Sequence, residues 1–172
     1  MLRLVLAFVD IAFHRRGPED LPASTFLLVL VVAVYVFVAS LALQLAPPVE
    51  RAALLLALDT TVYCGFIWGV LKSFNRERRF RQTAVALFGA DTLINLLSVP
   101  LLLWGGGLEA ADATPPAAAI AVLLLLCWQI DIAGYVLSRA IERPYVVGVS
   151  IMIAYVLLSF SVRASLSPPA AG

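Results

Sequence analysis

The chain has 172 residues, of which 62% are hydrophobic and 13% charged, and its formal net charge is +1. A soluble domain is typically about 45–50% apolar and about 25% charged, so this composition excludes an ordinary soluble protein. Together with a mean hydropathy of +0.98, it predicts an integral membrane protein. The length leaves room for one compact helical domain and for no additional soluble domain.

Residues 1–16 are expected to form a short amphipathic helix that lies in the membrane interface. Arg3, Asp10 and His14 fall on one narrow stripe of a helix whose other positions are mostly apolar. The four-residue spacing of Asp10 and His14 predicts an ion pair within that helix. Because Asp10 interrupts the apolar run and no small-residue cleavage site follows, a cleaved signal peptide is not expected.

Residues 17–172 are expected to form a bundle of five transmembrane helices. An apolar segment of about 20 residues can cross the roughly 30 Å of hydrocarbon in a bilayer. The segments of that kind lie near 23–45, 51–73, 82–104, 117–138 and 145–164. Prolines stand at the start of some of these segments and between others, where a helix can begin or must end. The predicted fold is therefore all-α and polytopic.

The basic residues indicate how these spans are oriented. Ten of the twelve lysines and arginines lie before the first predicted span, at the end of the second or between it and the third, or between the fourth and fifth. The positive-inside rule places these segments in the cytoplasm. The N-terminus is then cytoplasmic, and an odd number of spans leaves the C-terminus outside.

Three aspartates lie near the centres of separate predicted spans, where a charged carboxylate costs about 2.5–3.5 kcal/mol. Each is followed four residues later by a hydrogen-bonding side chain: Tyr63 follows Asp59, Asn95 follows Asp91 and Tyr135 follows Asp131. Residues at this spacing share a helix face. The three faces are expected to converge near the membrane midplane into one acidic, hydroxyl-rich site, with Thr60, Thr92 and Gln129 nearby.

Two interpretations of this site stay open. Its polar groups can link helices, each contributing roughly 0.6–2 kcal/mol to helix packing. They can instead form a proton relay or bind a cation, since intramembrane acids often mark ion pathways and hard cations prefer oxygen ligands. Catalysis is a more distant third interpretation.

The second span also carries a pattern of small residues. Thr61, Gly65 and Gly69 recur every four residues, which lets another helix approach closely. The approaching helix can belong to the same chain or to a second copy in a homodimer.

The loop between the second and third spans is strongly basic and contains Arg76, Arg78, Arg79 and Arg81. A short loop of this kind is expected to fix the topology and to bind anionic lipid headgroups at the cytoplasmic face. Docking of a cytoplasmic protein is the alternative, and nucleic acid is not an expected partner.

Enzymatic chemistry has little support in the sequence. Cys64 and Cys127 lie within predicted spans without a CxxC spacing, so neither a metal nor a redox role is expected. The single histidine argues against a Ser–His nucleophilic pair. Gly89-Ala90-Asp91 matches only part of an intramembrane aspartyl protease motif. We therefore expect no catalytic residues and no cofactor.

The segment Arg16-Gly17-Pro18-Glu19-Asp20-Leu21-Pro22 precedes the first span, and Gly134-Tyr135 lies in the fourth. With five spans and a cytoplasmic N-terminus, these residues resemble the Yip family of small membrane proteins. The resemblance implies a non-enzymatic protein, here a bacterial-type member of the inner membrane. Eukaryotic members bind Rab-type GTPases, but the longer cytoplasmic region that precedes their first span is not expected here, so GTPase binding is not implied.

The leading functional hypothesis is a non-enzymatic membrane scaffold or accessory protein of Yip-like type. Its expected partners are the lipid bilayer, anionic headgroups and other membrane proteins or a second copy of the chain. The alternative is a component of proton- or cation-coupled transport that uses Asp59, Asp91 and Asp131.

Overall fold

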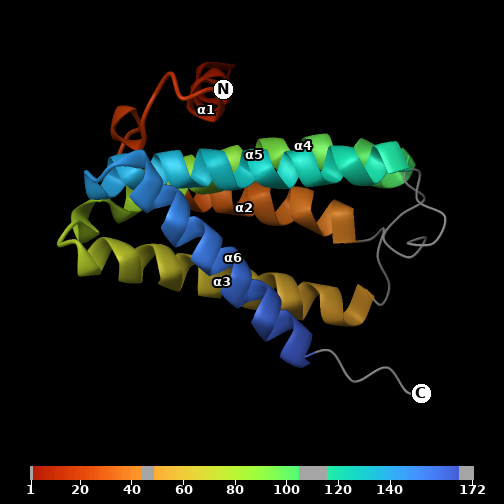
Figure 1. Cartoon of the computed structure of the whole chain (residues 1–172). Coiled ribbons are helices and arrows are strands. Elements are labelled where there is room, and N and C mark those ends of the chain that lie inside the picture. Colours follow the sequence, from red (N-terminus) through yellow and green to blue (C-terminus); the bar gives the residue numbers. More distant parts are fainter. Residues whose placement is uncertain (1, 44–48, 105–115, 167–172) are drawn as a thin grey trace.

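The computed structural model describes residues 2–43, 49–104 and 116–166, and these residues are all-α, without a β-strand (Figure 1). The α-helices are α1 (Leu2–Ala12), α2 (Thr25–Leu43), α3 (Val49–Ser73), α4 (Phe80–Trp104), α5 (Pro116–Ile141) and α6 (Tyr145–Leu166). Two single 3₁₀ turns, η1 (Pro18–Asp20) and η2 (Glu77–Arg79), precede α2 and α4. Helices α2 to α6 coincide with the five predicted apolar segments to within about three residues at each described end.

Local sequence signals explain several of these boundaries. Pro116 begins α5 and Pro144 directly precedes α6, because proline needs no amide partner in the first turn. The Ser24 hydroxyl accepts a hydrogen bond from the backbone amide of Leu27 (3.3 Å) and caps the start of α2. The Asp20 carboxylate accepts from the amide of Gly17 (2.9 Å), which closes η1.

Three helices are followed, one or two residues after their last residue, by a residue with a left-handed backbone. His14, Asn75 and Glu142 have φ values of 58°, 56° and 54°. After each, the next amide reaches back to a carbonyl five residues earlier, as between Arg76 and Leu71 (2.7 Å). This is the Schellman arrangement, which satisfies the last carbonyls of a helix. It turns the chain sharply without a glycine at any of the three positions.

Helix α4 occupies the centre of the bundle. It contacts α1, α2, α3 and α5, and the residues from Thr83 to Asp91 are all buried. Figure 1 shows α4 and α5 side by side, with α2 next to α4 and with α1 outside this pair. Helix α1 is seen almost end-on where the long helices lie across the view, so it runs across them. Phe8 of α1 sits against Gly89 of α4, where a Cβ atom would lie 2.3 Å from its ring.

Apolar side chains cover much of the outside of the long helices. Large exposed examples include Phe26 and Phe37 on α2, Leu54 on α3, Leu124 on α5 and Leu157 on α6. By length and composition, two segments of the described chain can cross a membrane, Glu77–Leu101 and Ala117–Ile141. Two shorter apolar helices, Thr25–Leu41 and Tyr145–Ser161, accompany them.

The N-terminal helix is shorter than expected, and the predicted ion pair between Asp10 and His14 is wrong. Helix α1 ends at Ala12 because the backbone turns left-handed at His14, so His14 is not on its polar stripe. Asp10 pairs with Arg16 (Nε to Oδ2, 3.2 Å) instead of His14. The turn carries the imidazole away from α1 and toward α5, where it meets Asp131.

The described residues do not support the first of the two alternatives for Thr61, Gly65 and Gly69, that another helix of this chain packs on them. Within the described residues, a Cβ atom added to either glycine would meet nothing within 4 Å, and Thr61 is exposed. Close packing occurs between α5 and α6, where a Cβ on Gly148 would lie 2.1 Å from the carbonyl oxygen of Gly134. A homodimer through the α3 face stays a prediction.

Candidate functional site

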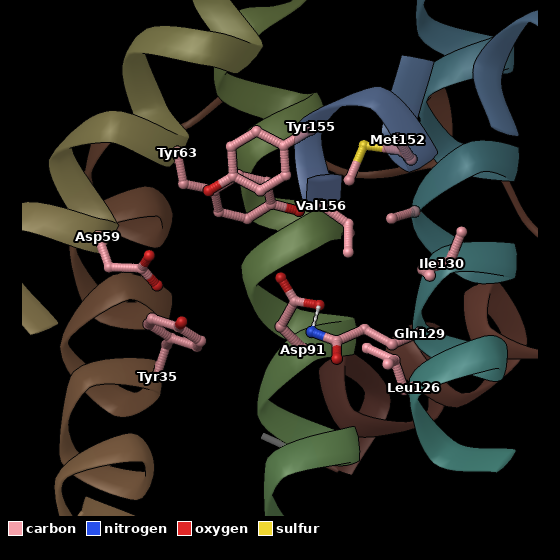
Figure 2. Close-up of a pocket in the computed structure, with 11 residues that line it drawn as sticks. Tyr35, Asp59, Tyr63, Asp91, Leu126, Gln129, Ile130, Met152, Tyr155 and Val156 are labelled. Carbon is pink, nitrogen blue, oxygen red and sulfur yellow. Dashed lines mark hydrogen bonds between the residues drawn. The ribbon is translucent and has the colours of Figure 1, made fainter. Parts of the chain in front are cut away.

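A cavity of about 100 Å³ lies between the long helices (Figure 2). Side chains from all five of them line it. The polar or aromatic members are Tyr35, Asp59, Tyr63, Asp91, Gln129 and Tyr155. The aliphatic members are Leu126, Ile130, Ala133, Met152 and Val156, all from α5 and α6.

Asp91 is the most deeply buried charged group of the described chain, with 5% of its surface exposed. Its Oδ1 accepts a hydrogen bond from Nε2 of Gln129 on α5 (3.0 Å), and the Tyr63 side chain is a second partner. A buried carboxylate is very costly unless it is hydrogen-bonded, so these two donors stabilise it where it lies. They also join α4 to α3 and α5.

Aromatic packing holds Tyr63 in place. Its ring stacks on Tyr155 of α6, with centroids 5.2 Å apart, and meets the edge of Phe88 at 5.3 Å. Phe88 also contacts Tyr35 of α2 (5.0 Å), and Phe66 contacts Tyr155 (4.5 Å). Such ring pairs contribute roughly 0.5–1.5 kcal/mol each beyond the area that they bury. The hydroxyl of Tyr63 is therefore presented to the cavity by a rigid frame.

Asp59 also lines the cavity, from α3, and stands to the left of Asp91 in Figure 2. It is half-buried, and its carboxylate and that of Asp91 repel each other. The lining contains no lysine, arginine or histidine, so the cavity is acidic. Thr60 and Thr92, expected nearby, donate instead to carbonyls of their own helices, those of Leu56 and Phe88.

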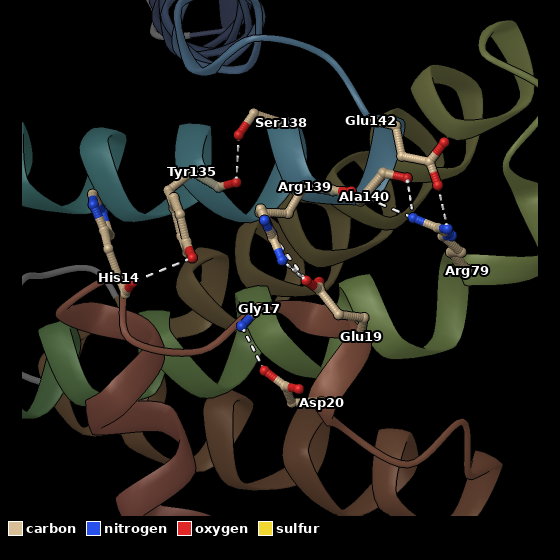
Figure 3. Close-up of polar contacts among 10 residues, drawn as sticks. All are labelled: His14, Gly17, Glu19, Asp20, Arg79, Tyr135, Ser138, Arg139, Ala140 and Glu142. Carbon is tan, nitrogen blue, oxygen red and sulfur yellow. Dashed lines mark hydrogen bonds and ion pairs between the residues drawn. The ribbon is translucent and has the colours of Figure 1, made fainter.

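Asp131 and Tyr135 do not join this site, which corrects the expectation of a single centre with three aspartates. Asp131 lies 3.1 Å from Nε2 of His14 and accepts a hydrogen bond from the Tyr145 hydroxyl. The His14 ring stacks on Tyr135 (4.2 Å), whose hydroxyl donates to the His14 carbonyl (3.3 Å; Figure 3). Asp131 is two residues from Gln129, about 200° around a helix, so the two side chains face opposite ways.

Asn95, the partner expected for Asp91, does not line the cavity. It lies one turn further along α4, whereas the cavity extends toward α5 and α6. Gln129, expected only as a neighbour, is the direct partner of Asp91. Sequence reasoning missed Tyr35 and Tyr155, although each places a hydroxyl in an otherwise apolar segment.

The arginines form a second polar region at the C-terminal end of α5 (Figure 3). Arg79 pairs with Glu142 and donates to the carbonyls of Arg139 and Ala140 (both 3.4 Å) at the end of α5. Arg139 in turn pairs with Glu19 of η1 (Nε to Oε1, 2.9 Å). These contacts join η1, η2 and the last turn of α5, which lie far apart in the sequence.

The remaining loop arginines differ in what they contact. Arg76 also pairs with Glu142, and Arg81 donates to the Thr25 hydroxyl (3.2 Å). Arg78 is exposed and makes no ion pair with any described residue. Lipid headgroup binding by this loop stays a prediction, and Arg78 is the arginine most available for it.

The described residues include no group of three or more His, Cys, Asp or Glu side chains that could hold a metal ion. No family model matches the chain, and no curated protein or solved structure is detectably similar to it. The fold and the site define an all-α protein with a buried acid–amide pair beside an acidic cavity. The resemblance to the Yip family stays a prediction.

Proposed function

We propose that the chain is a non-enzymatic integral membrane protein in which α2 to α6 all cross the bilayer. These helices have 19 to 26 residues, or about 28–39 Å at 1.5 Å per residue, which suits a roughly 30 Å hydrocarbon layer. Their outward faces carry the exposed Phe, Leu and Val side chains, which a lipid environment accommodates and water does not.

In this proposal the basic end of the bundle faces the cytoplasm. The segments that precede α2, join α3 to α4 and join α5 to α6 lie at one end in Figure 1. They hold most of the arginines, as the positive-inside rule requires. Helix α1 packs across α4 and α5, and its amphipathic pattern suits an interfacial helix. A bacterial inner membrane and a C-terminus outside complete the topology.

The role that we propose is that of a scaffold or accessory protein of Yip-like type. One observation carries it: the charged groups at the basic end are engaged with one another across distant segments. Arg139 with Glu19 and Arg79 with Glu142 each join parts of the chain more than 60 residues apart. Such pairs give the basic end of the bundle a fixed shape, with which it can contact lipid headgroups or other membrane proteins.

Cysteine labelling tests the topology. In a chain with Cys64→Ala and Cys127→Ala, the Asn75→Cys variant should react with an impermeant maleimide only in inside-out vesicles. The matched Gly106→Cys variant should react only in intact spheroplasts. Labelling of both positions from the same side would overturn the five-span proposal.

A second function is favoured by the cavity, because Asp59 and Asp91 both line it and no lysine, arginine or histidine is among the described lining residues. This suits a component of proton- or cation-coupled transport that uses Asp59 and Asp91. Flux into liposomes under proton, Na⁺, K⁺ and Mg²⁺ gradients decides between the two roles. Flux that Asp59→Asn and Asp91→Asn abolish, and that Asp131→Asn preserves, would establish transport. Folded protein without flux under any gradient favours the scaffold.

A further inference from the structure

The cavity has two chemically different halves. Helices α2, α3 and α4 contribute two carboxylates and two phenols, whereas α5 and α6 contribute mainly aliphatic side chains. Figure 2 shows the carboxylates of Asp59 and Asp91 on one side, with Ile130, Met152 and Val156 on the other. A ligand that fits both halves needs a cationic end and an apolar end.

The described residues that line the acidic half include no lysine, arginine or histidine. Asp59 and Asp91 repel each other, and the two donors to Asp91 are neutral. Neutral donors stabilise a carboxylate through hydrogen bonds but leave its charge in place. A cation placed between the two acids would relieve their repulsion and would be held by both.

The other half argues against a bare metal ion. Small hard cations take about six to eight oxygen ligands around them, whereas the α5 and α6 side of this cavity offers mostly C–H and thioether groups beside the Gln129 amide and the Tyr155 hydroxyl. An ammonium group donates to oxygen on one side only, and its alkyl chain needs apolar contacts. The two halves match such an ion.

The volume of the cavity limits the length of the alkyl chain that the ammonium ion can carry. An apolar cavity of about 150 Å³ accepts benzene, with roughly six heavy atoms. A cavity of about 100 Å³ accommodates proportionally fewer, on the order of four. Propylammonium has this size, and hexylammonium exceeds it.

We propose that the cavity binds a short-chain primary alkylammonium ion, with its nitrogen between Asp59 and Asp91 and its chain against α5 and α6. This rests on the proposal that the two acids form a cation site and adds the class of cation. It requires neither transport nor a particular topology, because binding can be measured without a gradient.

The test is calorimetric titration of the full chain in nanodiscs. Methyl-, propyl- and hexylammonium chloride would be compared with NaCl, KCl and 1-propanol, which matches propylammonium in length but carries no charge. Affinity should be highest for propylammonium. Asp59→Asn and Asp91→Asn should each weaken it by about ten-fold or more, because each removes a charge-assisted contact. Asp131→Asn, an acid outside the cavity, should leave it unchanged.

A separate variant, Ala133→Leu, tests the role of the aliphatic half of the cavity. Ala133 is buried in the wall, so Ala133→Leu should fill that half and weaken propylammonium more than methylammonium. If Asp91→Asn does not fold, Asp59→Asn and the comparison of methyl-, propyl- and hexylammonium still test the proposal. Equal binding of propylammonium and 1-propanol, or an affinity that Asp59→Asn does not change, would overturn the proposal. Binding of Na⁺ or K⁺ without alkylammonium would overturn it while leaving a cation site in place. If no cation binds, both proposals fail.

Discussion

Gly148 of α6 lies so close to Gly134 of α5 that a Cβ atom on Gly148 would stand 2.1 Å from the Gly134 carbonyl oxygen. The same Cβ would lie 2.8 Å from the Cβ and the amide nitrogen of Ser138. No rotamer change relieves a clash with backbone atoms, so any larger residue must push the two helices apart.

We therefore expect Gly148→Ala to destabilise the protein by about 1–3 kcal/mol, the usual cost of overpacking. Gly65→Ala is the matched control on α3, because its Cβ would enter open space. The control should be neutral or stabilise by up to about 1 kcal/mol through helix propensity. Thermal unfolding in detergent measures both, and equal melting temperatures would contradict the close crossing.

The hydrogen bond between Asp91 and Gln129 predicts a non-additive response. Gln129→Leu leaves a buried carboxylate with one donor fewer and should cost about 1–3 kcal/mol. The double variant Asp91→Leu/Gln129→Leu removes both partners and should be more stable than Gln129→Leu alone. Additive losses in this double-mutant cycle would show that the two side chains are not coupled.

His14 is expected to hold the end of α1 against the bundle. Its pair with Asp131 and its stacking on Tyr135 add to the hydrogen bond from the Trp128 indole to the Ala12 carbonyl (3.3 Å). His14→Ala should increase the rate of trypsin cleavage after the exposed Arg15, because the turn opens more often. The control is Asn75→Ala, at the equivalent turn after α3, which should leave cleavage at Arg15 unchanged.

Neighbouring arginines should differ sharply in their effect on stability. Arg79→Ala removes an ion pair and two hydrogen bonds to the end of α5, and we expect a loss of about 1–3 kcal/mol. Arg78→Ala removes an exposed side chain without an ion pair to any described residue and should change stability by less than about 0.5 kcal/mol. Denaturant titration of both variants checks this, and the reverse order would refute it.

The helices were predictable because their signals are local. Apolar length and proline positions located α2 to α6, since both act within one segment. The face that each helix turns inward depends on its neighbours. Gln129 and Asp131 are two residues apart, and both are polar, so the sequence did not reveal which of them faces Asp91. Similarly, the small residues on α3 and those at the α5–α6 crossing follow comparable patterns, and only one set meets another helix.

The left-handed turn after α1 could not be predicted from the sequence, for a related reason. His14 continues the apolar and polar periodicity of that helix, and nothing local marks it as the residue where the backbone reverses. Its contacts with Asp131 and Tyr135 come from more than 115 positions later in the chain. Only the assembled bundle favours that conformation over another helical turn.

The central position of α4 has a consequence for biosynthesis. Gln129 is made 38 residues after Asp91, which is about 2–8 s at 5–20 residues per second. During that interval Tyr63 is the one of its two protein donors that has already been made, and water or another molecule must take the place of Gln129. A nascent chain that stalls before α5 therefore leaves Asp91 without one of its two donors, a feature that can distinguish an incomplete product from a finished one.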